Sequence, residues 1–189
     1  MNVLGVSGSL RRDSYNTRLL RAASELLPEG VELELWDGLK AVPPYDEDDD
    51  GEPAPGPVTR LRAAIADADA VLIATPEYNA SVPGQLKNAL DWASRPLATN
   101  VLRNKPVAVV SASTGAFGAV WSQAELRKVL ARIGARVLER DVAVGHAPTR
   151  FDDAGRLVDD QLRGELAEVL LALALAAATR PDVEPAVAA

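Results

Sequence analysis

Cysteine is absent from this 189-residue chain, aromatic residues make up only 4% of it, and basic residues are outnumbered by acidic ones. The absence of cysteine excludes disulfides, thiol nucleophiles and cysteine-ligated metal or iron–sulfur sites. The 20 Lys and Arg against 27 Asp and Glu leave a net charge of −7. Because that charge opposes general binding to nucleic acid or to an anionic membrane surface, we expect neither as a partner.

Long hydrophobic runs are also missing. The longest uninterrupted apolar run, residues 169–178, has ten residues, whereas a helix needs about 20 to span a bilayer. The first residues lack the charged start and the long apolar stretch of a signal peptide. We therefore expect a cytoplasmic protein.

Short apolar segments alternate with longer helical patterns. The predicted strands are 2–7, 31–36, 70–75, 106–113 and 136–142, and the predicted helices are 15–27, 57–67, 83–93, 120–133 and 157–179. The strand centres at 71–74 and 107–110 are almost wholly apolar, which is typical of strands covered on both faces. This alternation favours an α/β fold, a doubly wound five-stranded parallel sheet with helices on both faces. We expect one domain over 1–180 and a disordered tail over 181–189.

The loop after the first strand carries small, hydroxyl and basic residues just before a predicted helix. Its polar side chains are Ser9, Arg11, Ser14 and Asn16. The N–H groups and the dipole of a helix N-terminus favour an anion, and an arginine adds a charge-assisted contact. Ser14 or Asn16 taken singly is explained by helix capping alone. The whole set with Arg11 predicts an oxyanion site.

The missing motifs narrow the choice of anion. No Gly-Lys pair exists, which excludes a P-loop, and the first strand–helix turn lacks the Gly-x-Gly-x-x-Gly dinucleotide fingerprint. A phosphomonoester remains. In a flavodoxin-like sheet of order 2-1-3-4-5, FMN binds where the first and third strands separate. The loop after the third strand is also polar, with the sequence Pro76, Glu77, Tyr78, Asn79.

A third loop, 111–118, follows the fourth strand. It contains Ser113, Thr114 and Gly115, small residues that let backbone amides approach a flat ring. A plain strand–helix connection favours the same residue types. Because this loop would lie on the same sheet edge as the other two, we interpret it as functional.

The segments 7–16, 76–96 and 111–118 resemble the NADPH-dependent FMN reductases, the group that contains many quinone, azo-dye and chromate reductases. The likeness extends over about residues 1–175, and the segment 76–96, PEYNASVPGQLKNALDWASRP, carries it most specifically. The chain has Ala119 and Trp121 where family members often have glycine and arginine.

The resemblance implies an FMN-binding site with a phosphate end and a ring end. It places the FMN phosphate against Ser9, Arg11, Ser14 and Asn16, and the ring against Pro76, Glu77, Tyr78 and Asn79, with Ser113, Thr114 and Gly115 at its pyrimidine end. Glu77 and Tyr78 are expected to position the ring rather than to transfer protons. No catalytic side chain is required, because the hydride chemistry belongs to the flavin.

The resemblance also implies a reaction and an assembly. NADPH or NADH is the expected electron donor, and a quinone, azo compound, metal oxyanion or free flavin is the expected acceptor, entering the same cleft in turn. The expected assembly is a homodimer or homotetramer, with the helix 83–93 and Trp92 close to the subunit contact. Two alternatives stay open: a flavodoxin-type FMN electron carrier that serves a protein partner, and a flavin-free phosphate-binding module.

Two further features are interpreted as structural, and no metal site is expected. Residues 46–52 hold six acids in seven positions, and we expect a solvated loop because neighbouring carboxylates repel one another. His146, the only histidine, has no ligand residues nearby in sequence, so we expect a role in loop packing rather than in catalysis or metal binding.

Overall fold

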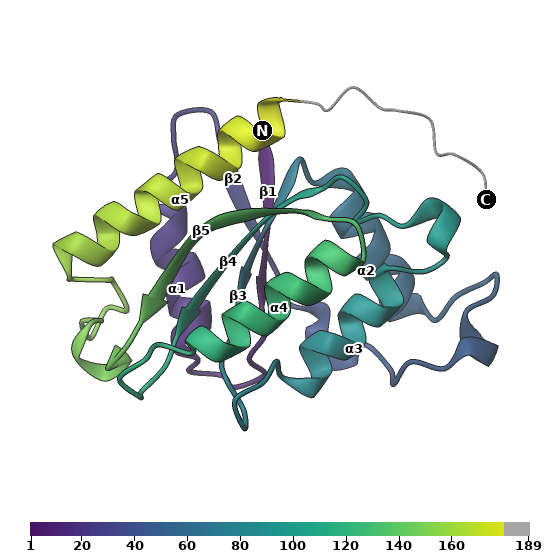
Figure 1. Cartoon of the computed structure of the whole chain (residues 1–189), viewed down its shortest axis with the longest axis horizontal. Helices are drawn as coiled ribbons and strands as arrows, with labels where there is room; N and C mark the ends of the chain where they lie inside the picture. Colours follow the sequence, from purple (N-terminus) through teal and green to yellow (C-terminus); the bar gives the residue numbers. More distant parts are fainter. Residues whose placement is uncertain (180–189) are drawn as a thin grey trace.

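The computed structural model describes residues 1–179, so the predicted tail at 181–189 lies outside the described residues. Five parallel strands form one sheet in the order β2-β1-β3-β4-β5 (Figure 1), which confirms the predicted fold class. The strands are β1 (Asn2–Ser7), β2 (Glu32–Trp36), β3 (Ala70–Ala74), β4 (Pro106–Ala112) and β5 (Arg136–Val144).

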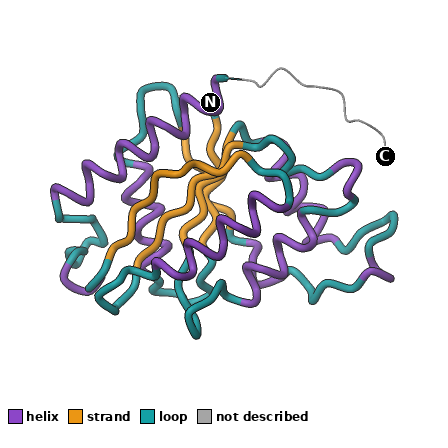
Figure 2. The backbone as a smooth tube through the Cα atoms, in the orientation of Figure 1, coloured by secondary structure: helices purple, strands orange, loops and turns teal. Residues whose placement is uncertain are grey.

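Helices cover both faces of the sheet, as predicted (Figure 2). They are α1 (Tyr15–Ser24), α2 (Gly56–Asp67), α3 (Gly84–Ala93), α4 (Val120–Arg132) and α5 (Asp160–Ala178). One core lies between the sheet and α1 with α5, and the other lies between the sheet and α2, α3 and α4. Every residue of β3 and β4 is buried, because apolar side chains that alternate in direction meet a helix layer on each side.

Two helix ends differ from the sequence prediction by three residues, and the other differences between predicted and observed helix ends are of one residue. The last helix begins at Asp160 rather than at 157, because Leu157 forms a bridge with Phe151 and the Asp159 carboxylate accepts the N–H of Leu162 as the helix cap. The first helix ends at Ser24 rather than at 27. Pro28 follows closely, and the residue before a proline avoids helical conformation.

The acidic segment is not simply a solvated loop, so that expectation is wrong at Asp50. The carboxylate of Asp50 is only 5% exposed and lies 2.7 Å from the Arg62 guanidinium and 3.4 Å from that of Arg95. Two arginines that are distant in sequence neutralise the carboxylate, and this offsets the cost of its burial. Among the described residues, no group of three acids or histidines could hold a metal ion.

Residues 1–179 contain no helix with the length and apolar character needed to cross a membrane.

Candidate functional site

Gly8 joins the loop after β1 to the loop after β3. Its N–H donates to the carbonyl of Ala74 at 2.8 Å. A Cβ at this position would lie 2.8 Å from Leu86 Cδ2, closer than real Cβ atoms approach, and 3.2 Å from Pro76 Cδ, a tight contact. The two loops therefore meet at the carboxyl ends of β1 and β3, where neighbouring parallel strands diverge into separate connections.

A cavity of about 140 Å³ opens at this junction and takes its walls from three loops. Nine of the eleven predicted site residues line it: Ser9, Arg11, Ser14, Asn16, Pro76, Glu77, Tyr78, Ser113 and Thr114. The other two, Asn79 and Gly115, do not line it. Tyr15 and Ala112 line it although the sequence did not single them out. Tyr15 directly follows the helix cap, and that position was the only signal that could have indicated it.

The N-terminus of α1 presents free donors to the cavity. Ser14 caps the helix, since its hydroxyl oxygen accepts the N–H of Asn16 at 3.1 Å. Within residues 1–179, the N–H groups of Tyr15 and Thr17 have no acceptor, and of these two residues only Tyr15 lines the cavity. These N–H groups and the positive end of the helix dipole suit an anion.

The Asn16 side chain is used inside the protein. Its Nδ2 donates to the Ala112 carbonyl at 2.9 Å, and its Oδ1 accepts the Ala112 N–H at 3.0 Å. Only the second hydrogen of Nδ2 is left to donate to a ligand. Asn16 therefore ties α1 to β4, a role that capping signals in the sequence do not reveal.

Serine hydroxyls around the cavity accept hydrogen bonds from nearby backbone. The oxygen of Ser9 accepts the N–H of Arg11 at 3.3 Å, and that of Ser113 accepts the N–H of Gly115 at 3.1 Å. A hydroxyl that accepts from its own loop keeps its proton to donate elsewhere. Ser9, Ser113 and the cap residue Ser14 can therefore each donate to an anion.

Arg11 supplies the positive charge of the site. Its side chain is exposed, and none of the described residues forms a salt bridge with it. An unpaired guanidinium beside hydroxyl and N–H donors is a suitable partner for a phosphate, which accepts two parallel hydrogen bonds from arginine.

The loop after β3 makes a tight two-residue turn. Tyr78 and Ser81 exchange backbone hydrogen bonds of 3.2 and 3.1 Å, and the residues between them, Asn79 and Ala80, have φ of 54° and 59°. Asparagine tolerates this left-handed conformation, but alanine adopts it only at a cost of about 1–2 kcal/mol. The strained turn holds Tyr78 half exposed at the edge of the cavity, with 48% of its surface accessible.

Two glutamates anchor this loop to α4. Glu77 accepts the N–H of Ser122 at 3.1 Å, near the start of that helix. Hydrogen bonds from the Ser81 hydroxyl and the Val82 N–H hold the pKa of Glu125 below its ordinary value. The Glu77 carboxylate is thus turned toward a helix N-terminus, an arrangement suited to holding the loop in place.

The third loop ends in two residues with left-handed backbone. Gly118 has a φ of 60°, and a Cβ there would lie 2.6 Å from the Ala143 carbonyl carbon. Ala119 has a φ of 70°, a conformation that glycine adopts without strain. That angle gives a physical reason for the glycine that the family often carries there. Trp121 packs against Phe117, and both rings are more than half exposed.

The lone histidine takes part in loop packing. The His146 N–H donates to the Gly115 carbonyl at 2.9 Å, and its own carbonyl accepts from Thr149. Trp92 has a role within the chain, and its expected position close to a subunit contact stays a prediction. It is completely buried within the chain, and its Nε1 donates to the Pro43 carbonyl at 2.9 Å.

Taken together, these donors fit the cofactor predicted from the sequence. Free helix N–H groups, donor hydroxyls and one arginine suit a phosphate, and Pro76 and Tyr78 of the neighbouring loop add ring side chains to the lining of the cavity. A phosphate with an attached planar ring, as in FMN, matches both parts.

Comparison with known proteins agrees with this chemistry. The sequence model of a family described as NADPH-dependent FMN reductase matches residues 1–149. An NAD(P)H-dependent FMN reductase of Pseudomonas aeruginosa is 44% identical over 176 residues, which cover 93% of this chain and 94% of the relative. A 2-hydroxy-1,4-benzoquinone reductase of a Burkholderia species is 39% identical over 164 residues, which cover 86% of this chain and 88% of the relative.

A solved structure is also similar. It is the flavoenzyme FerB of Paracoccus denitrificans, an NAD(P)H:(acceptor) oxidoreductase. It superposes with a TM-score of 0.85 at 33% identity, over 94% of this chain and 97% of FerB.

Proposed function

This chain belongs to the NADPH-dependent FMN reductase family, and from that membership we propose how its own residues serve the family's reaction. The protein is an FMN-dependent NAD(P)H oxidoreductase that passes electrons to a small-molecule acceptor. One structural observation carries the proposal. Arg11, the N-terminus of α1 and the loop after β3 share a cavity at the point where β1 and β3 diverge.

At the phosphate end, Arg11 neutralises charge while the hydroxyls of Ser9 and Ser14 and the N–H group of Tyr15 donate hydrogen bonds. The backbone N–H of Asn16 is already used by Ser14, so Asn16 contributes at most its second amide hydrogen. Its main part in the site is to hold the helix N-terminus against β4. This assignment is supported by the free donors described above.

The volume of the cavity determines how much of the FMN it can enclose. Cavities that enclose a whole cofactor usually measure about 300–1,000 Å³, against the roughly 140 Å³ found here. We therefore assign the cavity to the phosphate end and the ring to its open mouth, beside Pro76, Glu77, Tyr78 and Asn79. Ser113, Thr114 and Gly115 are assigned to the pyrimidine end.

Bound FMN supplies the hydride chemistry, which no side chain of this protein has to perform. The residues of the chain bind and orient. Glu77 is held by Ser122, which suits it to fix the loop and not to move a proton. An open mouth leaves room for the nicotinamide and the acceptor to use the same face in turn.

Partners beyond the electron acceptor and donor are proposals. A homodimer or homotetramer is supported by the exposed pair Phe117 and Trp121, which lie three and seven positions after the cavity residue Thr114. Exposed aromatic side chains are enriched at protein interfaces. We also keep as proposals a cytoplasmic location and the absence of nucleic-acid or membrane partners. Because the relatives carry reductase names, a flavodoxin-type electron carrier is not favoured.

The experiment is anaerobic mixing of the FMN-loaded protein with NADPH. Rapid loss of the yellow colour, restored by a benzoquinone, is the expected result. A protein that stays yellow would instead be an electron carrier, and a protein that takes up no FMN would contradict the cofactor site.

A further inference from the structure

Two hydroxyl side chains from different elements meet at one carbonyl beneath the loop that follows β3. Thr75 comes directly after β3, Ser122 lies in the first turn of α4, and both residues are completely buried. Thr75 Oγ1 lies 2.8 Å and Ser122 Oγ 2.9 Å from the carbonyl oxygen of Pro76. The two hydroxyl oxygens are 3.0 Å apart. None of the roles assigned above uses these hydroxyls.

The number of protons shows how firmly this carbonyl is held. The two hydroxyls have two protons for three contacts, and the contact between them can hold only one proton. At least one hydroxyl therefore donates to the Pro76 carbonyl in every arrangement. A carbonyl oxygen has two lone pairs, so it can also accept from both hydroxyls at once. Because the donors come from two different elements, they restrict rotation of the carbonyl more than a single hydrogen bond would.

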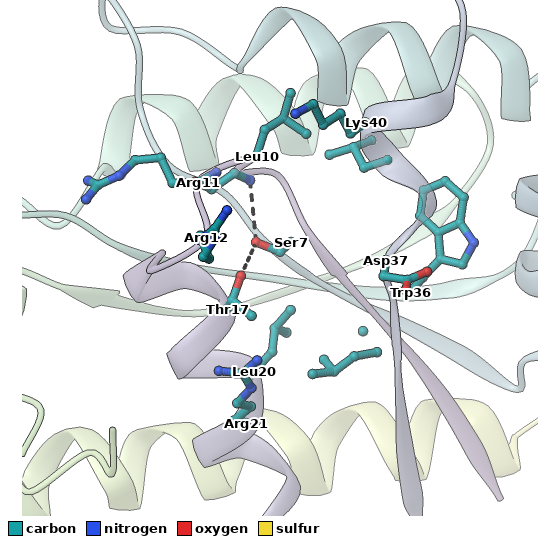
Figure 3. Close-up of a pocket in the computed structure, with 14 residues that line it drawn as sticks. Ser7, Leu10, Arg11, Arg12, Thr17, Leu20, Arg21, Trp36, Asp37 and Lys40 are labelled. Carbon is teal, nitrogen blue, oxygen red and sulfur yellow. Dashed lines mark hydrogen bonds between the residues drawn. The ribbon is translucent and has the colours of Figure 1, made fainter. Parts of the chain in front are cut away.

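A second pair of hydroxyls, in the loop after β1, acts on a different backbone group. Ser7 Oγ accepts the Thr17 hydroxyl at 2.9 Å and the Ser9 N–H at 3.4 Å, as the dashed lines in Figure 3 show. That pair therefore holds a backbone N–H. The pair of Thr75 and Ser122 holds a backbone carbonyl instead, and this leaves the N–H of the same peptide free to donate elsewhere.

The peptide between Pro76 and Glu77 carries that free N–H. This peptide is trans, and the N–H and C=O of a planar trans peptide point in opposite directions. The hydroxyl pair holds the carbonyl, so it also directs the Glu77 N–H away from the pair. Within residues 1–179 this N–H has no acceptor, while Pro76 and Glu77 both line the cavity of the proposed flavin site. A carbonyl that accepts hydrogen bonds polarises its amide and makes the N–H a stronger donor.

Ser122 holds the same segment at a second point. Its backbone N–H donates to the Glu77 carboxylate at 3.1 Å. One residue of α4 therefore contacts both the carbonyl that precedes Glu77 and the side chain of Glu77. The N–H that lies between these two points has little freedom to turn.

We propose that the hydroxyls of Thr75 and Ser122 position the Pro76–Glu77 peptide so that the Glu77 N–H donates a hydrogen bond to the ring of bound FMN. The inference rests on the proposed function, which sets the ring beside Pro76 and Glu77. Hydrogen bonds to the ring are one of the means by which a protein orients a flavin and tunes its electronic properties. Both hydroxyls are buried and act through the peptide, so Thr75 and Ser122 are positioning residues.

Removing the two hydroxyls, singly and together, tests the proposal in the full-length protein. Thr75→Val and Ser122→Ala each leave one hydroxyl to donate to the Pro76 carbonyl. Each single variant should bind FMN within about threefold of the parent protein, and the double variant about tenfold more weakly, as expected for the loss of one hydrogen bond. The visible absorption bands of FMN bound to the double variant should also be displaced, because the ring loses a donor.

Ser94→Ala is the matched control. Ser94 is 8% exposed, and its hydroxyl donates to the Asp91 carbonyl at 3.0 Å. This substitution removes a buried serine hydroxyl that does not line the cavity, so FMN affinity and spectrum should stay those of the parent protein. A double variant that matches Ser94→Ala in both properties would overturn the proposal, even with a lower melting temperature, because a purely structural role changes stability alone.

Hydrogen exchange in the parent protein, followed by NMR, needs no substitution and decides the case in which the double variant does not fold. The Glu77 N–H should exchange more slowly with FMN bound than in the apoprotein. Equal exchange in the two forms would overturn the proposal. Uptake of FMN by the parent protein reports on the proposed function separately, so the two ideas can fail independently.

Discussion

The side-chain amide of Asn16 holds both backbone groups of Ala112, although 96 positions separate the two residues. Nδ2 donates to the carbonyl at 2.9 Å and Oδ1 accepts the N–H at 3.0 Å. Asn16 is only 3% exposed. This pair fixes the N-terminus of α1, and therefore the donors that we assign to the cofactor phosphate, relative to the end of β4.

Replacing Asn16 with alanine tests this relationship. Asn16→Ala should lower the free energy of unfolding by about 2–6 kcal/mol, because it leaves two buried backbone groups unsatisfied at about 1–3 kcal/mol each. Urea unfolding followed by circular dichroism measures the change. Asn2→Ala is a suitable control, since the Asn2 side chain makes no hydrogen bond within residues 1–179 and its removal should have a small effect. Equal stability of the two variants would contradict a structural role for Asn16.

Arg11→Ala should weaken FMN binding by about 1.5–3 kcal/mol, the usual contribution of a hydrogen bond to a charged group. Titration of the apoprotein with FMN, followed by flavin fluorescence, gives the affinity. Arg132→Ala provides the same loss of charge on a distant helix and should bind FMN like the parent protein. If Arg11→Ala also binds FMN unchanged, the phosphate assignment is wrong.

Asn79→Gly distinguishes two roles of Asn79, the conformation of the turn and the positioning of the flavin ring. Glycine adopts the φ of 54° at this position without strain, so the melting temperature should stay close to that of the parent protein. We expect reduction by NADPH to slow by about tenfold to a hundredfold, because small errors in position cost rate on that scale. Stopped-flow absorbance measures the rate. An Asn79→Gly protein that unfolds, or that is reduced at the parent rate, would show that Asn79 serves the turn alone.

The lowered pKa of Glu125 predicts that the stability of the folded protein decreases at acid pH. The Ser81 hydroxyl and the Val82 N–H lower its pKa in the folded protein, so the native state binds this proton less readily than the unfolded state. Its contribution to stability is therefore complete above the ordinary value of 4.5 and is lost as the pH falls through the lower folded value.

Glu125→Gln should reduce the drop in melting temperature between about pH 7 and pH 3, since it removes one group that acid would protonate. Differential scanning calorimetry at the two pH values measures the drop. Glu29→Gln changes an exposed carboxylate with no hydrogen bond among the described residues, and it serves as the control. A drop as large in Glu125→Gln as in the control would contradict the linkage.

The strands and most of the site could be predicted from the sequence because both leave local patterns, whereas the strand order was taken from the known flavodoxin-like fold. Apolar runs of strand length, such as 71–74, are buried wherever helices cover both faces, and polar residues that follow parallel strands collect on one sheet edge. The three loops therefore came together as expected. The start of α5 was less predictable. Leu157 pairs with Phe151 in an isolated bridge, so it cannot belong to the helix, and Asp159 caps the helix two positions later.

By itself, the sequence determined the flavodoxin-like fold, the family and the chemistry of the donors, because these depend on residue type, spacing and hydrophobic period. The tertiary structure alone decided which donors are free. It turned Asn16 toward Ala112, paired Asp50 with two distant arginines and buried Trp92. The physical reason is that a hydrogen bond, an ion pair or a cavity depends on distances between segments far apart in the chain, which packing sets and local pattern does not encode.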